Sequence, residues 1–200
     1  CLREREKFSD IMEMYCGSRL GFGAVCLGGV VDDATDGWFF RIEKAVTSIK
    51  EFLPDLRTSL LAHPFFEERA RGLGVIPAAE ARRWNIRGPN GRASGLLDLD
   101  GRMRRPYGAY RNISQPLPAP QFTSGDAWAR AWARMEEIFH SASLIEECFR
   151  RIPAGNFRIR VALDIIPPAG RSYSEVEGPR GTIGLLAESR GERYPAEVRF

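Results

Sequence analysis

The hydrophobic pattern of this sequence changes its period once, and the change comes after Gly155. Before it, apolar residues recur every three or four positions over long runs, which is the spacing of one face of an α-helix. After it, apolar and polar residues alternate, as in a half-buried β-strand. Helices first and strands last predict an α+β fold that is mostly α. We expect a helical core over residues 1–155 and a small antiparallel β appendage over residues 156–200.

Two of the helical runs have clear ends. The first covers residues 3–15, and Gly17 ends it because glycine readily adopts the left-handed conformation that closes a helix. The other follows Thr123-x-x-Asp126, a pattern that resembles a capping box, and continues to Pro153. Both runs predict amphipathic helices with a single apolar face.

The helical run between them contains a proline. It begins at Asp36, a suitable N-cap, and its apolar stripe continues to about His63. Pro54 has no amide proton to donate and should break or kink a helix at this point. The run therefore predicts either two packed helices or one bent helix.

Residues 65–120 show little periodicity. Short helices are expected near residues 66–71 and from Pro77, whose fixed φ suits a first helical position. Glycines and prolines interrupt the rest, so we expect a long loop whose conformation depends on tertiary contacts. Ordered loops of this length often serve function.

The end of the chain predicts four short strands. Alternation covers residues 157–161, 173–177, 183–187 and 194–200, and turns that contain glycine separate them. Strands joined in this way form a small antiparallel sheet.

Composition excludes several classes of protein. With 44% apolar and 28% charged residues, 200 residues suffice for a buried core. No stretch approaches the ~18 consecutive apolar residues of a membrane span. The formal net charge of +3 is too small to indicate nucleic-acid binding. Four cysteines without a Cys-x-x-Cys pair favour a reducing compartment. The chain begins with Cys1 inside a charged run, so we expect it to be a piece of something longer.

The sequence contains no recognisable active site. His63 and His140 have no carboxylate or cysteine at ligand spacing, so both are expected to be structural. Gly21-x-Gly23 follows a helix, whereas a dinucleotide-binding glycine loop follows a strand. No Gly-x-Ser-x-Gly elbow or cysteine signature supplies a nucleophile. We therefore predict no catalytic residue, no metal ligand and no cofactor within this chain.

Arginines are concentrated in the loop-rich middle of the chain. Only Asp98 and Asp100 accompany eight of them there, which are Arg82, Arg83, Arg87, Arg92, Arg102, Arg104, Arg105 and Arg111. Such a cluster fits internal ion pairs or a surface for an acidic partner. Nucleic acid is the weakest interpretation, because few aromatic residues lie among the arginines for bases to stack on. We expect Arg92 to be buried and paired.

Six ordered blocks of the sequence resemble one subunit family. They are Arg3-Glu4-Arg5-Glu6-Lys7; Gly17-Ser18-Arg19-Leu20 with Gly28-Gly29-Val30; Arg69-x-Arg71-Gly72-Leu73-Gly74-Val75-Ile76; Gly88-Pro89-Asn90-Gly91-Arg92-Ala93-Ser94-Gly95 with Arg105-Pro106-Tyr107; Gly125-Asp126 with Arg134-Met135-Glu136-Glu137; and Glu175-Val176-Glu177-Gly178-Pro179-Arg180-Gly181. The family is the one shared by the large subunit of membrane-bound, energy-converting NiFe hydrogenases and the quinone-site subunit of respiratory complex I. The resemblance runs almost from end to end.

The resemblance also marks departures. In the hydrogenase branch two Cys-x-x-Cys motifs hold the NiFe centre, and neither is present in these residues. The complex I branch carries a histidine and an arginine in the glycine-rich turn, where this sequence has Gly21 and Cys26. The second departure, together with Gly28-Gly29-Val30-x-x-Asp33, which resembles the hydrogenase-like branch, favours a membrane-bound hydrogenase or a hydrogenase-like relative, with a complex I subunit or a non-catalytic scaffold as alternatives. Thr182 stands where the family pattern has an acidic residue.

Cofactors and a location follow from the resemblance. The parent protein would be an oxidoreductase subunit with a NiFe centre or a quinone, and this piece alone would be inactive. A small partner subunit would carry an iron–sulfur cluster, and membrane-arm subunits would be indirect partners. The implied location is the cytoplasm, peripheral at the inner face of the cell membrane.

Site residues follow as well. The residues expected to contact the iron–sulfur subunit are Gly21, Cys26, Arg92, Arg104 and Arg105. The residues expected to form structural ion pairs are Arg92, Glu177 and Arg180.

Overall fold

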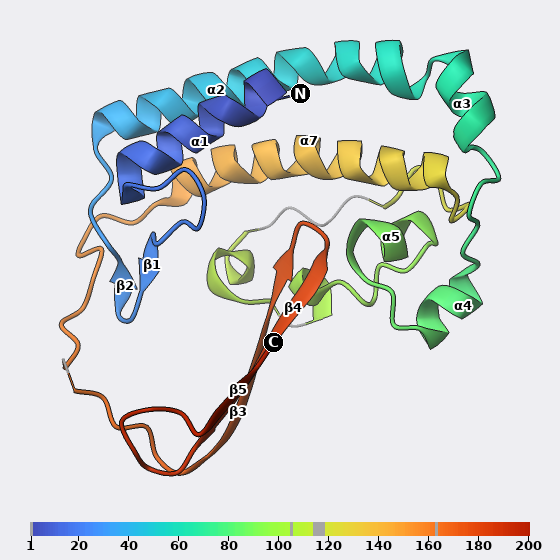
Figure 1. Ribbon diagram of the computed structural model, residues 1–200. Helices are drawn as coiled ribbons and strands as arrows, with labels where there is room; N and C mark the ends of the chain where they lie inside the picture. The colour runs from blue at the N-terminus through green and yellow to red at the C-terminus, as the bar shows by residue number, and fades with distance from the viewer. Residues whose placement is uncertain (1, 105, 114–118, 163) are drawn as a thin grey trace. The chain divides into compact units, whose positions relative to one another are not determined.

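The computed structural model describes residues 2–104, 106–113, 119–162 and 164–200. Helices precede a three-stranded antiparallel sheet at the C-terminal end (Figure 1), which confirms the mostly α, α+β class. The chain divides into two compact units, each built from two segments. The N-terminal unit contains Cys1–Pro54 and Ile145–Leu163, and the C-terminal unit contains Asp55–Leu144 and Asp164–Phe200.

A buried carboxylate joins the first two helices of the N-terminal unit, α1 (Leu2–Cys16) and α2 (Asp36–Leu56). Glu4 is only 1% exposed. Its carboxylate accepts hydrogen bonds from Lys7 Nζ at 2.6 Å and from Ser48 Oγ at 2.9 Å. The hydrogen bond from Lys7 is the main reason that the pKa of Glu4 falls to about 2. The two helices therefore meet at a charged group that stays ionised.

Pro54 lies inside α2 and does not end it. The helical run continues as a π-helical turn, η1 (Arg57–Leu61), in which Ala62 N donates to Arg57 O at 2.9 Å. Of the two predicted alternatives, two packed helices or one helical run through Pro54, the structure therefore has the single run. A proline removes a single backbone donor, and the wider turn after it changes the hydrogen bonding without stopping the helix.

The glycine-rich turn of the N-terminal unit forms a small hairpin from β1 (Val25–Cys26) and β2 (Gly29–Val30). This hairpin lies against residues 157–161, because Ile159 N donates to Gly28 O at 3.0 Å. The prediction of a strand over residues 157–161 is wrong, since they contribute only an isolated bridge to this hairpin. Glycines allow the two backbones to approach so closely.

The middle of the chain holds more helix than its sequence predicts. The two expected short helices are present as α3 (Pro64–Ala70) and α4 (Ala78–Arg83). The segment interpreted as loop contains α5 (Gly88–Ala93), α6 (Gly101–Arg104) and the 3-10 turn η2 (Gly108–Arg111). Elements of four to six residues are too short to show a helical period.

The long helix α7 (Ala127–Arg151) is the third helix expected from the sequence. The Asp126 carboxylate accepts hydrogen bonds from Ala129 N at 2.8 Å and from Gly72 N at 3.0 Å. Asp126, and not Thr123, is therefore the N-cap, because its oxygen reaches the third helical amide.

Small residues and aromatic rings form the core of the C-terminal unit. Ala93, Ala129 and Ala133 pack together against Phe122. The ring of Phe122 meets that of Trp128 at a centroid distance of 4.1 Å. Alanines at this contact let α5 approach α7 closely, which fixes the position of the charged residues at the end of α5.

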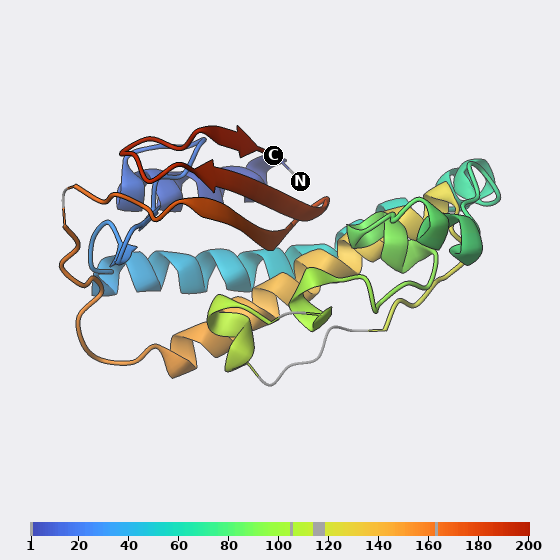
Figure 2. The same cartoon turned by 90° about the horizontal axis from the view of Figure 1, so that it is seen from below.

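The C-terminal sheet contains β3 (Gly170–Gly178), β4 (Gly181–Ser189) and β5 (Glu197–Arg199) in the order β3-β4-β5. Figures 1 and 2 show β3 and β4 as a long hairpin. Within the described part of the chain the sheet has three strands and not the expected four, because residues 157–161 pair in the other unit.

The two faces of the β3–β4 hairpin differ in chemistry. One face carries Glu175 and Glu177, which contact α6. The opposite face carries apolar side chains that are 38% to 55% exposed, namely Val176, Ile183, Leu185 and Val198. The hairpin therefore turns its acidic face toward its own unit and leaves its apolar face uncovered.

Gly29 offers a test of the close approach in the N-terminal unit. Its φ is +154°, and a Cβ atom there would lie 2.2 Å from Phe157 O. We expect Gly29→Ala to lower the free energy of unfolding by about 1–3 kcal/mol, because the backbone must move or stay strained. Gly23→Ala is the matched control, since a Cβ atom there meets nothing within 4 Å. Equal thermal midpoints for the two variants would contradict the packing described here.

Candidate functional site

Two arginines and two carboxylates meet inside the C-terminal unit, and we call them the charge cluster. Arg92 comes from α5, Arg102 from α6, Asp100 from the turn before α6, and Glu137 from α7. Asp100 is 2% exposed, and neither arginine is more than 8% exposed. Two short helices, one long helix and the turn before α6 thus bring charged side chains together at one buried site.

The charge cluster is a closed ring of alternating charges. Asp100 Oδ2 accepts from Arg92 Nη1 at 2.6 Å and from Arg102 Nη2 at 2.8 Å. Arg102 Nη1 donates to Glu137 Oε1 at 2.6 Å, and Arg92 Nη2 donates to the other oxygen of Glu137. Two cations and two anions balance, so the buried group carries no net charge.

The contacts within the cluster keep Asp100 and Arg102 ionised. Burial raises the pKa of Asp100, but hydrogen bonds from Arg102 outweigh burial and leave that pKa below its ordinary value. Burial likewise lowers the pKa of Arg102, and hydrogen bonds to Asp100 and Glu137 raise it further than burial lowers it. Asp100 and Arg102 are therefore charged at neutral pH.

His140 lies beside the cluster on α7. It is 8% exposed, and its Nε2 has no hydrogen-bond partner among the described residues. Burial is the main cause that lowers the pKa of His140; Arg102 and Arg92 lower it too, while Glu137 and Asp100 act in the opposite direction. The imidazole is therefore neutral at physiological pH. The other histidine, His63, caps α3 by accepting from Phe65 N at 3.2 Å.

Glu177 connects the sheet to α6. Its Oε2 accepts from Gly101 N at 3.2 Å and from Thr182 Oγ1 at 2.9 Å, and its own N donates to Tyr107 Oη at 2.8 Å. Gly101 directly follows Asp100 of the charge cluster. Glu177 therefore ties the β3–β4 hairpin to the turn that presents Asp100.

Glu175 makes a second connection on the same face. Arg104 donates to Glu175 Oε1, and Arg87 Nη1 lies 3.9 Å from Glu175 Oε2. The hydrogen bond from Arg104 is the largest influence on Glu175 and lowers its pKa. Glu175 thus holds the hairpin to α6 through Arg104 and to the start of α5 through the ion pair with Arg87.

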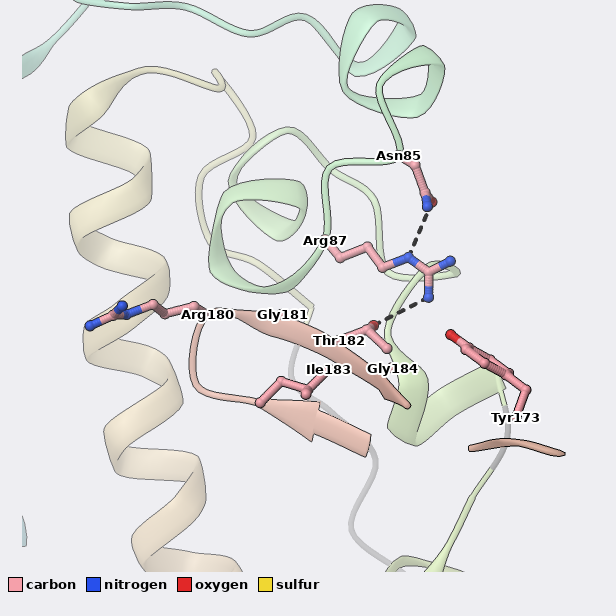
Figure 3. Close-up of a pocket in the computed structure, with 8 residues that line it drawn as sticks. All are labelled: Asn85, Arg87, Tyr173, Arg180, Gly181, Thr182, Ile183 and Gly184. Carbon is pink, nitrogen blue, oxygen red and sulfur yellow. Dashed lines mark hydrogen bonds between the residues drawn. The ribbon is translucent and has the colours of Figure 1, made fainter. Parts of the chain in front are cut away.

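A pocket of about 430 Å³ opens beside the β3–β4 turn, and we call it the hairpin pocket. Its lining residues are Asn85, Arg87, Tyr173, Arg180, Gly181, Thr182, Ile183 and Gly184 (Figure 3). Gly88 at the start of α5 packs on this turn, since a Cβ atom there would lie 2.6 Å from Gly181 N. The segment from Asn85 to Gly88 and the β3–β4 turn are far apart in the sequence, but together they form one wall of the hairpin pocket.

The structure distributes the residues singled out from the sequence over both units. Gly21 and Cys26 belong to the N-terminal unit, with Cys26 in β1 as a free thiol. Arg92, Arg104, Glu177 and Arg180 belong to the C-terminal unit. Arg105 lies outside the described residues.

These residues meet different partners in the structure. Arg92 has two ion pairs inside the charge cluster, and Arg104 has one with Glu175. Glu177 makes hydrogen bonds, and within residues 2–104, 106–113, 119–162 and 164–200 no ion pair of Glu177 or Arg180 is formed. The ion pairs of this face belong to Glu175 instead.

Sequence reasoning missed most of the partners in the charge cluster. Asp100 and Arg102 were visible only as members of an arginine-rich stretch, and Glu137 only as part of a family block. Their convergence depends on α5, α6 and α7 packing together, which no local pattern shows. The available signal was that Asp98 and Asp100 are the carboxylates within the arginine-rich stretch, and the structure shows that Asp100 pairs with Arg92.

Neither a metal-ligand cluster nor a membrane-spanning helix is found among the described residues. In that part of the chain, no three His, Cys, Asp or Glu side chains gather as a metal site would require. None of the helices there combines the length and apolar character of a membrane-spanning segment.

The fold of this chain is similar to that of a subunit of a respiratory membrane complex. A chain of the membrane-bound sulfane sulfur reductase, an archaeal respiratory membrane complex, matches it with a TM-score of 0.90 and 27% identity. The match covers 99% of this chain and 54% of that chain. Residues 1–167 match the family described as the 49 Kd subunit of the respiratory-chain NADH dehydrogenase, and the chain belongs to this family.

Curated relatives agree with this family. The D subunit of the NADH-quinone oxidoreductase of Carboxydothermus hydrogenoformans is 37% identical over 96% of this chain and 52% of its own length. The corresponding protein of Bacillus cytotoxicus is 33% identical over 99% of this chain and 54% of its own length. The chain therefore spans about half the length of the curated relatives it matches.

These relatives confirm the family resemblance and correct the preferred branch. They are named as NADH-quinone oxidoreductase subunits, which favours the complex I alternative over the hydrogenase-like expectation. Gly21 and Cys26 suggested the hydrogenase branch because they depart from the complex I pattern. Two positions in a turn are weak evidence against similarity along the whole chain.

Arg92 gives a test of the charge cluster. We expect Arg92→Ala to lower the free energy of unfolding by about 3–5 kcal/mol, because Asp100 and Glu137 would share one cation in a buried site. Arg83→Ala is the control, since its side chain is 71% exposed and should change stability by at most about 1 kcal/mol. Chemical denaturation followed by tryptophan fluorescence measures both. Similar midpoints for the two variants would show that the cluster contributes little.

The burial of His140 can be tested through the pH dependence of the free energy of unfolding. Its pKa in the folded chain lies below the ordinary value of about 6.5, so the unfolded chain takes up the proton first as the pH falls. We therefore expect the free energy of unfolding to decrease from about pH 7 to pH 5, and His140→Phe to reduce that decrease. Denaturation curves at several pH values measure it. An identical pH dependence in the variant would remove His140 as the cause.

Proposed function

We propose that this chain is the scaffold and docking part of a quinone-site subunit in a membrane-bound respiratory oxidoreductase of the complex I type. The observation that carries the proposal is similarity along nearly the whole chain to proteins named as the D subunit of NADH-quinone oxidoreductase. The fold shared with a chain of an archaeal respiratory membrane complex supports the same assignment. In the whole protein the activity is electron transfer to a quinone.

The role that we propose for this chain within the whole protein is structural, because its buried charges fix the elements that would contact partner subunits. The charge cluster and the carboxylates of the β3–β4 hairpin fasten α5, α6, α7 and the sheet into one body. Buried charges that pair with one another in this way position the elements that carry them. We assign the electron carriers to other parts of the assembly, with an iron–sulfur cluster in a small partner subunit.

The glycine-rich turn is the surface that we assign to the iron–sulfur subunit. Around Gly21 and Cys26 it carries large apolar side chains that are 51% to 81% exposed, namely Leu20, Phe22, Val25 and Leu27. A cluster of exposed apolar residues on a short hairpin is typical of a protein–protein contact. Arg92 is too deeply buried to take part, and Arg104 is already engaged by Glu175.

The proposed location follows from the assembly. The solved relative belongs to a membrane-bound complex. We propose that this chain is held peripherally at the inner face of the cell membrane through its partner subunits, with membrane-arm subunits as indirect neighbours.

Val25 tests the docking surface. Val25 is 81% exposed, so Val25→Glu should leave the fold intact but place a charge in the contact. We expect the full-length protein with this change to co-purify with less of the iron–sulfur subunit, by about tenfold or more. Met14→Glu is the matched control, since Met14 is 47% exposed on α1 of the same unit. Equal recovery of the partner with both variants would place the interface elsewhere.

A further inference from the structure

The guanidinium of Arg87 in the hairpin pocket is incompletely neutralised. Its Nε donates to Asn85 Oδ1 at 3.1 Å and its Nη1 donates to Thr182 Oγ1 at 3.2 Å, and both acceptors are neutral. Arg87 Nη1 also forms a long ion pair of 3.9 Å with Glu175 Oε2, and Arg87 shares this carboxylate with Arg104. Arg87 Nη2 has no partner among the described residues.

The position of Arg87 allows its positive charge to bind a ligand. Its side chain is 16% exposed and lines the hairpin pocket, so it is largely withdrawn from water but still borders an open space. Partial desolvation strengthens a charge-assisted hydrogen bond to a ligand. Asn85 has a φ of +52°, a left-handed conformation that asparagine tolerates, and from there its amide orients the guanidinium.

Two glycines let the walls of the hairpin pocket pack closely. A Cβ atom at Gly184 would lie 2.6 Å from the hydroxyl of Tyr173, and one at Gly181 would lie 3.3 Å from the Arg87 backbone, so these glycines set the positions of Tyr173 and Arg87 in the pocket wall. Figure 3 shows Asn85, Arg87 and Tyr173 grouped on one side of the pocket, while the side chain of Arg180 extends away from them. Arg87 is therefore the cation that a ligand would meet.

We propose that the hairpin pocket binds a carboxylate through Arg87. A carboxylate has two oxygens in a plane that match the planar edge of a guanidinium, and it supplies the negative charge that Thr182 and Asn85 do not. The exposed ring of Tyr173 offers an apolar wall for a short aliphatic stem. The carboxylate comes from an acidic residue of a partner polypeptide or from a free dicarboxylic acid. This site is separate from the proposed docking turn around Gly21 and Cys26.

Calorimetric titration of the full chain tests the proposal. The probes are glutarate, the peptide acetyl-Ala-Glu-Ala-amide, and acetyl-Ala-Gln-Ala-amide as the neutral counterpart, all at constant ionic strength. We expect saturable binding of at least one carboxylate probe and none of the neutral peptide. Arg87→Gln should weaken binding by about tenfold or more, because a charge-assisted hydrogen bond contributes at least this much. Arg180→Gln is the control on the same rim and should leave the affinity unchanged.

The outcomes are distinguishable. If the acidic peptide binds and glutarate does not, the ligand is an acidic residue of a polypeptide. If glutarate binds, the pocket accepts free dicarboxylic acids. Arg87→Lys keeps the charge but loses the planar fork, and it should bind about fivefold or more weakly, so it gives the answer if Arg87→Gln does not fold. Absence of saturable binding, unchanged affinity in Arg87→Lys, or equal losses in the Arg87 and Arg180 variants would overturn the proposal.

Discussion

The ring of alternating charges formed by Arg92, Asp100, Arg102 and Glu137 is the constraint on which the C-terminal unit depends. Removing these charges from water costs free energy. Their mutual attraction compensates for this cost only when every hydrogen bond is made. A slightly different arrangement of α5, α6 and α7 would leave a buried charge unpaired. The ring therefore acts mainly on specificity, because it penalises every alternative packing of the three helices, two of which are too short to be stable alone.

The sheet depends on the same ring. Glu177 accepts from the amide of Gly101, which directly follows Asp100, and Glu175 binds Arg104 at the other end of α6. A four-residue helix is not stable alone, so α6 exists because it is held by the ring on one side and by the hairpin on the other. These contacts also fix the positions of the hairpin pocket and of Arg87.

The long elements of this fold could be predicted from the sequence, and the charged site largely could not. Helix α1 and helix α7 have strong apolar periods, and Gly17 ends the first of them as expected. Residues 157–161 also have the period of a strand, but their partner is the turn at Gly28 and Gly29, and partner choice is not encoded locally. Burial of Arg92 was expected from its setting in an aperiodic loop. Its partners Asp100 and Glu137 come from elements whose meeting depends on tertiary packing.

The hairpin that turns its carboxylates inward has an outward face of Val176, Ile183, Leu185 and Val198. Water next to such a face is displaced more favourably as the temperature rises and as strongly hydrated salts such as sulfate are added. This face is therefore one surface through which copies of the chain can associate. Warm, sulfate-rich solutions favour association through the sheet, whereas cold, low-salt solutions keep the chain dispersed.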